Sequence, residues 1–433
     1  MVKRYLCLWV AILLIFSMLA VAACKTIAPN DPVQPIDPDS TVLSKLTATN
    51  GKVTNDDGKE VLLRGTNVGG LFVTEHWMTG FVYGGSPSND YRSLTQTFIK
   101  RFGEEQTKAL WAEYRSDWWQ EVDLKICADM GFNVLRLPFT YMNVDFAAVT
   151  DYENAGKQYD FSDLDNFVNT AAKYGMYTIL DLHGAYGSQN GQDHSGQIID
   201  NVSDVDFYSN EQMMSLTIKL WGALAEHFRG NTNVAGYDIL NEPGEKAGVT
   251  SERHWNFYNR VYNAIRAKGD EHIVIFESCW DAENLPRVEQ YGWTNCMYSF
   301  HHYAGDELSY TDYCNRWNYK LSSVASKNFG VPLFMGEFTN YKFYDNWRYT
   351  LNLLNKSDWH WTTWTYKVWN NSAWGVVNVR GSNNDKVRAD TDSYEDIIKK
   401  FGYLRTEFCQ KYTFSNGITL ENLLIEFAKT NED

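Results

Sequence analysis

The chain lacks an excess of basic residues. It carries 39 Lys and Arg against 54 Asp and Glu, which gives a formal net charge of -15. A protein that binds nucleic acid needs a basic face for the phosphates, so this charge argues against a nucleic-acid partner. A solvated acidic surface is typical instead of a secreted protein.

A regular cysteine framework is also absent. Of the seven cysteines, Cys7 lies in an N-terminal apolar run and Cys24 directly follows it. An odd remainder with irregular spacing and no C-x-x-C pair argues against both a disulfide framework and a cysteine metal site. The domain is therefore expected to depend on its core. The remaining cysteines are Cys127, Cys279, Cys296, Cys314 and Cys409.

The N-terminal run has its own signature. Lys3 and Arg4 precede apolar residues 5–23, and small residues lead to a cysteine in Val21-Ala22-Ala23-Cys24. The pattern resembles a bacterial lipobox, which implies a signal peptide over residues 1–23 and a lipid on the Cys24 thiol. An ordinary signal peptide is one alternative. An uncleaved anchor is another, but the run is barely long enough to span a bilayer.

Residues 24–45 are rich in Pro and Asp and poor in apolar residues. Such a segment cannot bury enough surface to fold, and proline stiffens it. It is predicted to tether the folded domain, residues 46–433, to a membrane. The expected location is extracytoplasmic, as a lipoprotein on the cell surface or in the periplasm.

Aromatic residues make up 15% of the chain, with 16 Trp and 27 Tyr. Most of these side chains are expected to pack in the core, but exposed rings can stack on the C–H faces of sugars. The composition favours a carbohydrate ligand without proving one.

Strand-like and helix-like segments alternate along the domain. After a hairpin with Asn50-Gly51 and Asp57-Gly58 as turns, amphipathic segments such as 163–173, 213–227 and 252–267 separate short apolar runs. Strict alternation with eight runs predicts an α/β fold, a (β/α)8 TIM barrel, with a doubly wound open sheet as the alternative. A helical C-terminal extension from Ser393 is expected to pack outside the barrel. The eight runs are 61–66, 133–138, 177–182, 234–240, 272–277, 296–300, 332–336 and 361–366.

Two glutamates end such runs. Glu242 follows Tyr237-Asp238-Ile239-Leu240-Asn241, and Glu337 follows Val331-Pro332-Leu333-Phe334-Met335-Gly336. A carboxylate just past a parallel strand lies on the face where barrel active sites are built, and two make a catalytic pair plausible. This is the arrangement that a glycoside hydrolase needs.

Further polar and aromatic residues fall at equivalent strand ends. Taken singly, Arg136 could form a core salt bridge and His183 could be a satisfied buried histidine. Their shared position at strand ends is hard to assign to packing. The set comprises Glu75, Arg136, His183, Asn241, His301, Tyr303 and Trp364.

With Asn241-Glu242-Pro243, Gly336-Glu337-Phe338 and these strand-end residues, the domain resembles glycoside hydrolase family 5, whose members are retaining β-glycosidases. The segments 64–79 and 181–191 are similar to motifs of its exo-β-1,3-glucanase branch. Leu71 stands where that branch usually has Trp, and His76 and Tyr186 stand where it usually has Pro. These departures bear more on the substrate than on the mechanism.

The resemblance implies a role for each site residue. Glu337 would be the nucleophile and Glu242 the acid/base, with Glu337 ionised and Glu242 protonated near neutrality. Arg136 and Tyr303 would keep Glu337 charged, and Asn241 would bind the sugar O2. His183 and His301 would complete the polar wall of the site. Glu75 would accept hydrogen bonds from sugar hydroxyls, and Trp364 would form the floor on which the sugar stacks.

The expected substrate is a β-glucan or β-gluco-oligosaccharide, cleaved by an exo-β-1,3-glucanase or β-glucosidase. An endo-β-1,4-glucanase and a β-mannan-active enzyme remain alternatives within the family. From other classes, a non-catalytic carbohydrate-binding lipoprotein would be expected to have lost one glutamate, and a metal-dependent hydrolase is disfavoured because no histidines show zincin spacing. No cofactor or metal is expected, and the domain is expected to be a monomer.

Overall fold

The computed structural model describes five stretches of the chain: residues 42–82, 90–244, 250–278, 281–370 and 372–429. The predicted signal peptide, the lipidation site Cys24 and most of the tether lie outside these stretches. No helix within them is long and apolar enough to cross a membrane. The four cysteines that the stretches contain are free: Cys127, Cys296, Cys314 and Cys409.

A closed parallel barrel forms the centre of the fold, with strand order β10-β3-β4-β5-β6-β7-β8-β9. Each of the eight predicted runs supplies one strand, so the (β/α)8 prediction is confirmed and the open sheet is excluded. The strands are β3 (Arg64–Asn67), β4 (Val134–Thr140), β5 (Tyr177–Gly184), β6 (Val234–Asp238), β7 (Ile273–Glu277), β8 (Cys296–His302), β9 (Leu333–Phe338) and β10 (His360–Thr363).

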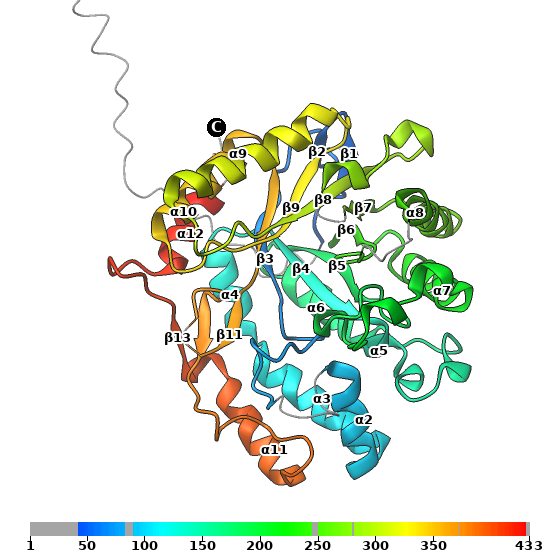
Figure 1. Ribbon diagram of the computed structural model, residues 1–433, viewed down its shortest axis with the longest axis vertical. Helices are drawn as coiled ribbons and strands as arrows, with labels where there is room; N and C mark the ends of the chain where they lie inside the picture. Colours follow the sequence, from blue (N-terminus) through cyan, green and yellow to red (C-terminus); the bar gives the residue numbers. More distant parts are fainter. Residues whose placement is uncertain (1–41, 83–89, 245–249, 279–280, 371, 430–433) are drawn as a thin grey trace, which may run out of the picture. The chain divides into compact units, whose positions relative to one another are not determined.

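Helices surround the barrel on its outer side (Figure 1). Local signals set their ends: the side chain of Ser309 accepts a hydrogen bond from the Asp312 backbone at the start of α9, and Asn328 ends it in the left-handed conformation. The three amphipathic segments predicted as helices are α6, α7 and α8. The barrel helices are α4 (Glu121–Asp129), α6 (Ser162–Ala172), α7 (Glu211–Phe228), α8 (Ser251–Arg266), α9 (Tyr310–Lys327) and α10 (Tyr344–Lys356), with a short α5 (Tyr141–Val144).

The N-terminal hairpin is also present. Strands β1 (Thr47–Thr49) and β2 (Lys52–Thr54) pair antiparallel across Asn50-Gly51. Both turn residues have positive φ, 54° and 75°, which is the conformation that an Asn-Gly turn requires.

Two additions were not predicted. Helices α2 (Tyr91–Phe102) and α3 (Glu104–Trp118) are inserted between β3 and α4, and a second small sheet joins β11 (Lys367–Trp369), β12 (Val377–Val379) and β13 (Cys409–Lys411).

The C-terminal extension is therefore not purely helical, although it contains α11 (Tyr394–Phe401) and α12 (Leu420–Ala428). Helix α11 lies beside α3 (Figure 1). Phe401 of α11 contacts Tyr114 of α3, with ring centroids 5.3 Å apart. Buried Lys367 also attaches the extension, because its ammonium donates to the Trp118 carbonyl oxygen and to Oγ1 of Thr406.

Candidate active site

The two predicted catalytic glutamates lie at the same end of the barrel. Glu242 follows β6, the fourth barrel strand, and Glu337 belongs to β9, the seventh. The sequence analysis ended this strand at residue 336 and placed Glu337 just beyond it. That placement was wrong, because β9 continues to Phe338 and Glu337 is its second-last residue. Because parallel strands deliver their carboxyl ends to one face, the two side chains converge.

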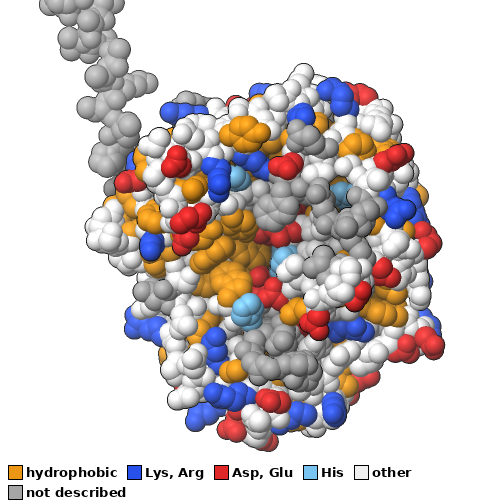
Figure 2. Space-filling view, in the orientation of Figure 1, with side chains coloured by type: hydrophobic (Ala, Val, Ile, Leu, Met, Phe, Trp, Pro, Cys, Tyr) orange, Lys and Arg blue, Asp and Glu red, His pale blue; other side chains and the backbone are white. Residues whose placement is uncertain are grey.

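A cavity of about 400 Å³ opens at this face. Figure 2 shows a hollow in which acidic and histidine side chains adjoin a hydrophobic surface. Three of the predicted residues, Arg136, Asn241 and His301, are buried and do not line the cavity. They contact the lining residues from the interior of the barrel. The lining residues are Glu75, Trp77, His183, His194, Glu242, Tyr303, Glu337, Trp364 and Trp374.

Arg136 organises the floor of the cavity from β4. Its guanidinium is fully buried and lies 2.8 Å from Oε1 of Glu337, 2.9 Å from Oδ2 of Asp238 and 3.1 Å from Oδ1 of Asp181. It also donates to the side-chain oxygen of Asn241 at 2.8 Å. Burial alone would lower the pKa of Arg136, but the surrounding carboxylates raise it well above its usual value. The site therefore contains a permanent buried positive charge.

Glu337 is held at both oxygens. Arg136 contacts Oε1, and the Tyr303 hydroxyl donates to Oε2 at 2.7 Å. Burial raises the pKa of Glu337 above its usual value, and the charge of Arg136 and the Tyr303 hydrogen bond oppose that rise. These contacts favour the ionised form that a nucleophile needs.

Glu242 has the opposite electrostatic setting. Burial raises its pKa well above the usual value, and the charges of Glu337 and Glu75 raise it further. The expected ordering follows, with Glu242 retaining its proton to higher pH than Glu337. Two carboxyl groups pushed apart in this way can serve as acid and nucleophile.

The two carboxyl groups share a histidine neighbour. Nδ1 of His301 lies 2.9 Å from Oε1 of Glu242 and 3.5 Å from Oε2 of Glu337. Oxygens that reach one nitrogen at these distances match the close pair of a retaining glycosidase, about 5–5.5 Å, better than the roughly 6.5–9.5 Å of an inverting one.

His183 and Trp364 form a stacked pair at the base of the cavity. Their rings are 5.3 Å apart and inclined by 4°. Nδ1 of His183 lies 2.6 Å from Oδ2 of Asp181, and burial lowers the pKa of His183 to about 3. A neutral imidazole with one nitrogen bound to Asp181 leaves Nε2 facing Glu337 at 3.9 Å.

An aromatic wall that the sequence analysis did not identify continues from Tyr303. The ring of Trp374 lies 4.9 Å from that of Trp77, 5.6 Å from that of Tyr303 and 5.2 Å from that of Tyr341, measured between centroids. Exposed faces of such rings suit sugar C–H groups. The tryptophan-rich composition was the available signal, but it could not place these rings together.

Glu75 adjoins this wall, because Nε1 of Trp77 donates to its carboxyl group at 2.8 Å. Burial and the charge of Asp193 raise the pKa of Glu75 well above its usual value. The carboxyl group can therefore donate as well as accept hydrogen bonds to sugar hydroxyls.

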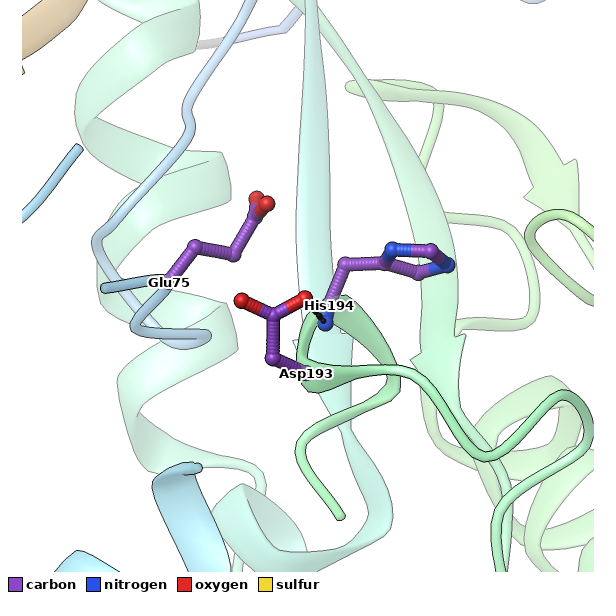
Figure 3. A group of neighbouring side chains, drawn as sticks. All are labelled: Glu75, Asp193 and His194. Atoms are coloured by element: carbon purple, nitrogen blue, oxygen red, sulfur yellow. Dashed lines mark hydrogen bonds between the residues drawn. The ribbon is translucent and has the colours of Figure 1, made fainter. Parts of the chain in front are cut away.

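Ligand atoms of Glu75, Asp193 and His194 lie within 4.8 Å of one another, close enough to consider a metal ion. Figure 3 shows Asp193 and His194 on one turn, with the His194 ring extending away from the Asp193 carboxylate. Oδ2 of Asp193 is 2.8 Å from Nδ1 of His76. Nε2 of His194 is 2.8 Å from Nδ2 of Asn190 and 3.3 Å from Oε2 of Glu242, so protein groups already contact these two ligand atoms. Glu242, Glu277 and His301 form a second such group. The metal-free reading stays a prediction.

Sequence reasoning also missed Glu277. This buried residue ends β7, and its Oε2 accepts a hydrogen bond of 3.0 Å from the backbone N–H of Glu242. The signal that identified Glu337, a glutamate at the end of an apolar run, was present here too. Glu242 has a φ of 38°, and this bond helps to hold its uncommon backbone conformation.

Comparison with known proteins adds to this geometry. The family model described as Cellulase (glycosyl hydrolase family 5) matches residues 99–372. The chain is 29% identical to a Beta-xylosidase from Phanerodontia chrysosporium over 266 residues, 60% of this chain and 52% of that protein. It is 30% identical over 208 residues to a probable glucan 1,3-beta-glucosidase A from Aspergillus fumigatus, covering 47% of each. The chain spans about half the length of these curated relatives.

Among solved structures, the chain resembles a rutinosidase from Aspergillus niger, with a TM-score of 0.58 and 16% identity over 79% of this chain and 98% of that one. At this identity the likeness shows the fold alone.

Proposed function

This chain belongs to glycosyl hydrolase family 5, and we propose that it is a retaining enzyme that cleaves β-glucosidic bonds in β-glucans or β-gluco-oligosaccharides. The observation that carries the proposal is the paired setting of the two glutamates. Glu337 is held by Arg136 and Tyr303, while Glu242 lies among carboxylates that favour its protonated form.

In the first half of the reaction, Oε1 or Oε2 of Glu337 attacks the anomeric carbon and forms a glycosyl ester. Glu242 transfers its proton to the leaving oxygen as the glycosidic bond breaks. Arg136 and Tyr303 orient the attacking carboxylate. The Asn241 oxygen accepts from Arg136 at 2.8 Å, which leaves its Nδ2 to donate to the sugar O2.

In the second half, water attacks the anomeric carbon and the ester bond to Glu337 breaks. Esterification removed the negative charge of Glu337, which is one cause of the raised pKa of Glu242. The pKa of Glu242 therefore falls in the intermediate, and its carboxylate can take the proton from water. The sugar leaves with the β configuration that it had in the substrate.

We favour exo action on β-1,3-glucan or short β-glucosides. The resemblance to the exo-β-1,3-glucanase branch supports this, as does the probable glucan 1,3-beta-glucosidase A among the relatives. A contact between His76 and Asp193 also joins the loops after β3 and β5 beside Glu75, which is consistent with a cavity closed at one end. The Beta-xylosidase among the relatives makes a β-xyloside the second candidate.

We also propose that the mature chain is a monomeric lipoprotein held outside the cytoplasm by a lipid on Cys24. The support is the sequence Val21-Ala22-Ala23-Cys24 and the Pro- and Asp-rich tether that follows it.

The test is hydrolysis by the domain of residues 46–433, with the full chain in parallel. The panel comprises laminarin, cello- and mannooligosaccharides, mixed-linkage glucan and aryl β-glucosides and β-xylosides, with products resolved by size and anomer. Release of β-glucose from laminarin is the expected result. Hydrolysis of another substrate with retained anomeric configuration would keep the mechanism and change the proposed substrate. Inverted configuration would refute the mechanism, and no hydrolysis of any substrate would favour a carbohydrate-binding protein.

A further inference from the structure

The carboxyl group of Glu242 lies between two imidazoles. Nδ1 of His301 is 2.9 Å from Oε1, and Nε2 of His194 is 3.3 Å from Oε2. His301 belongs to β8, whereas His194 belongs to a 3-10 turn, η3 (Asp193–Ser195), in the loop after β5. Each oxygen therefore has its own histidine, supplied by a different part of the barrel.

His301 presents a proton to Oε1. Its Nδ1 is close to three carboxylate oxygens: Glu242 at 2.9 Å, Glu277 at 3.4 Å and Glu337 at 3.5 Å. A proton on Nδ1 serves Oε1 of Glu242 and Oε2 of the ionised Glu337, which can only accept hydrogen bonds. Burial also lowers the pKa of His301 well below its usual value, which indicates a neutral ring with its proton on Nδ1.

His194 presents a lone pair to Oε2. Nδ2 of Asn190 lies 2.8 Å from Nε2 of His194 and donates to the Glu242 carbonyl oxygen at 3.0 Å. The amide orientation follows from its other end, where Oδ1 of Asn190 accepts from the Gln192 backbone at 2.9 Å. Nε2 therefore carries no proton, and its single lone pair is shared by the Asn190 N–H at 2.8 Å and Oε2 of Glu242 at 3.3 Å. Burial lowers the pKa of His194 to about 4, so the ring is neutral near neutrality.

The two neighbours give the carboxyl group a polarity. Oε1 faces a donor and is the acceptor oxygen, whereas an ionised Oε2 would face a lone pair. We propose that His194 is a positioning residue that keeps the acid proton of Glu242 on Oε2, with Asn190 fixing the imidazole tautomer. The inference rests on the proposed function, in which Glu242 is the acid/base.

The proposal also orients the substrate. In glycosylation the Oε2–H bond breaks and the proton forms an O–H bond to the leaving oxygen, so the leaving group lies on the His194 side of the cavity that both residues line. In deglycosylation Oε2 takes a proton from water, which returns the pair to its starting state.

Several charged or titratable groups act on Glu242 besides His194, so a pH profile reports their sum. Glu75 comes from the loop after β3, Arg136 from β4 and Asp181 from β5. Glu277 comes from β7, His301 and Tyr303 from the end of β8, and Glu337 from β9. A comparison between variants at residue 194 holds these groups constant.

His194→Phe removes the acceptor but keeps a flat ring that excludes water. We expect kcat/KM for an alkyl β-glucoside, whose leaving group needs a proton, to fall about 10-fold or more. A dinitrophenyl β-glucoside, whose leaving group needs none, should lose less than about twofold. The basic limb of the pH profile should move to lower pH. His194→Gln, whose carbonyl oxygen can accept from Asn190, should recover most of the loss.

His227→Phe is the matched control, because His227 lies on α7 and pairs with Asp165 outside the cavity. His194→Leu carries the same expectation as His194→Phe if the phenyl ring does not fit. Equal losses on both glucosides with an unmoved basic limb, or wild-type behaviour of His194→Phe, would overturn the proposal. Inactivity of the wild-type enzyme on every substrate would instead refute the proposed function.

Discussion

The hydroxyl of Tyr303 donates a hydrogen bond of 2.7 Å to Oε2 of Glu337. Burial and the neighbouring charge of Glu337 raise the pKa of Tyr303 well above its usual value, so the hydroxyl retains its proton. It therefore acts as a permanent donor that stabilises the ionised nucleophile, and ester formation weakens this stabilisation because it removes the charge of the carboxylate.

Tyr303→Phe should therefore raise the pKa of Glu337 and misorient its carboxylate. A hydrogen bond to a charged group is worth roughly 1.5–3 kcal/mol, so we expect kcat/KM to fall about 10- to 100-fold and the acidic limb of its pH profile to move to higher pH. Tyr341→Phe, in the same aromatic wall, is the control. An unmoved acidic limb would remove Tyr303 from this role.

Arg136 should be required for folding as well as for catalysis. Removing one partner of a fully buried charge network costs about 3–5 kcal/mol, so Arg136→Met should lower the free energy of unfolding by that amount in urea titrations. Arg136→Lys keeps the charge but cannot reproduce the forked contacts to Asp238 and Asn241. It should be more stable than Arg136→Met and still catalytically impaired. Equal stability of all three proteins would contradict this role.

Glu75 should make stability depend on pH. Its folded-state pKa is raised, chiefly by burial, so the folded protein binds this proton more tightly than the unfolded chain does. The carboxyl group therefore costs no stability below its unfolded pKa, about 4.3, and costs progressively more as the pH rises toward its folded value. Glu75→Gln should match the wild-type Tm at pH 4 and exceed it at pH 8. A constant difference across that range would show that ionisation is not the cause.

Cys24 should determine membrane attachment. In bacterial cells that process lipoproteins, the wild-type chain should fractionate with membranes and carry a lipid, whereas Cys24→Ser should appear in the soluble fraction. Cys7→Ser, inside the predicted signal peptide, is the matched control and should remain attached. Membrane association of Cys24→Ser would point to an uncleaved anchor.

Patterns along the chain were sufficient for the barrel. When short apolar runs of four to eight residues alternate with amphipathic helices, each run is expected to form a buried parallel strand. The same reasoning placed Glu242 and Glu337 together, since carboxyl ends of parallel strands share a face. The added sheet was missed because β12 and β13 are three-residue strands that pair across about 30 residues of chain.

The remaining site residues depend on long-range contacts. His194 and Asn190 lie in a loop without periodicity, and their relation to Glu242 arises only when the loop after β5 meets the loop after β6. Trp374 likewise reaches Trp77 from nearly 300 residues away. Glu277 is different, because its position at a strand end was readable and its role as a hydrogen-bond acceptor for the Glu242 backbone was not.

The most direct test of the two-glutamate account is covalent trapping of the nucleophile. An activated 2-deoxy-2-fluoro-β-glucoside forms the glycosyl ester but slows its hydrolysis, because fluorine destabilises the oxocarbenium-like transition state. Mass spectrometry of digested protein should show one fluoroglucosyl unit on the peptide that contains Glu337, and none in Glu337→Gln. A label on another residue, or turnover of ordinary substrates by Glu337→Gln at near the wild-type rate, would contradict the assignment.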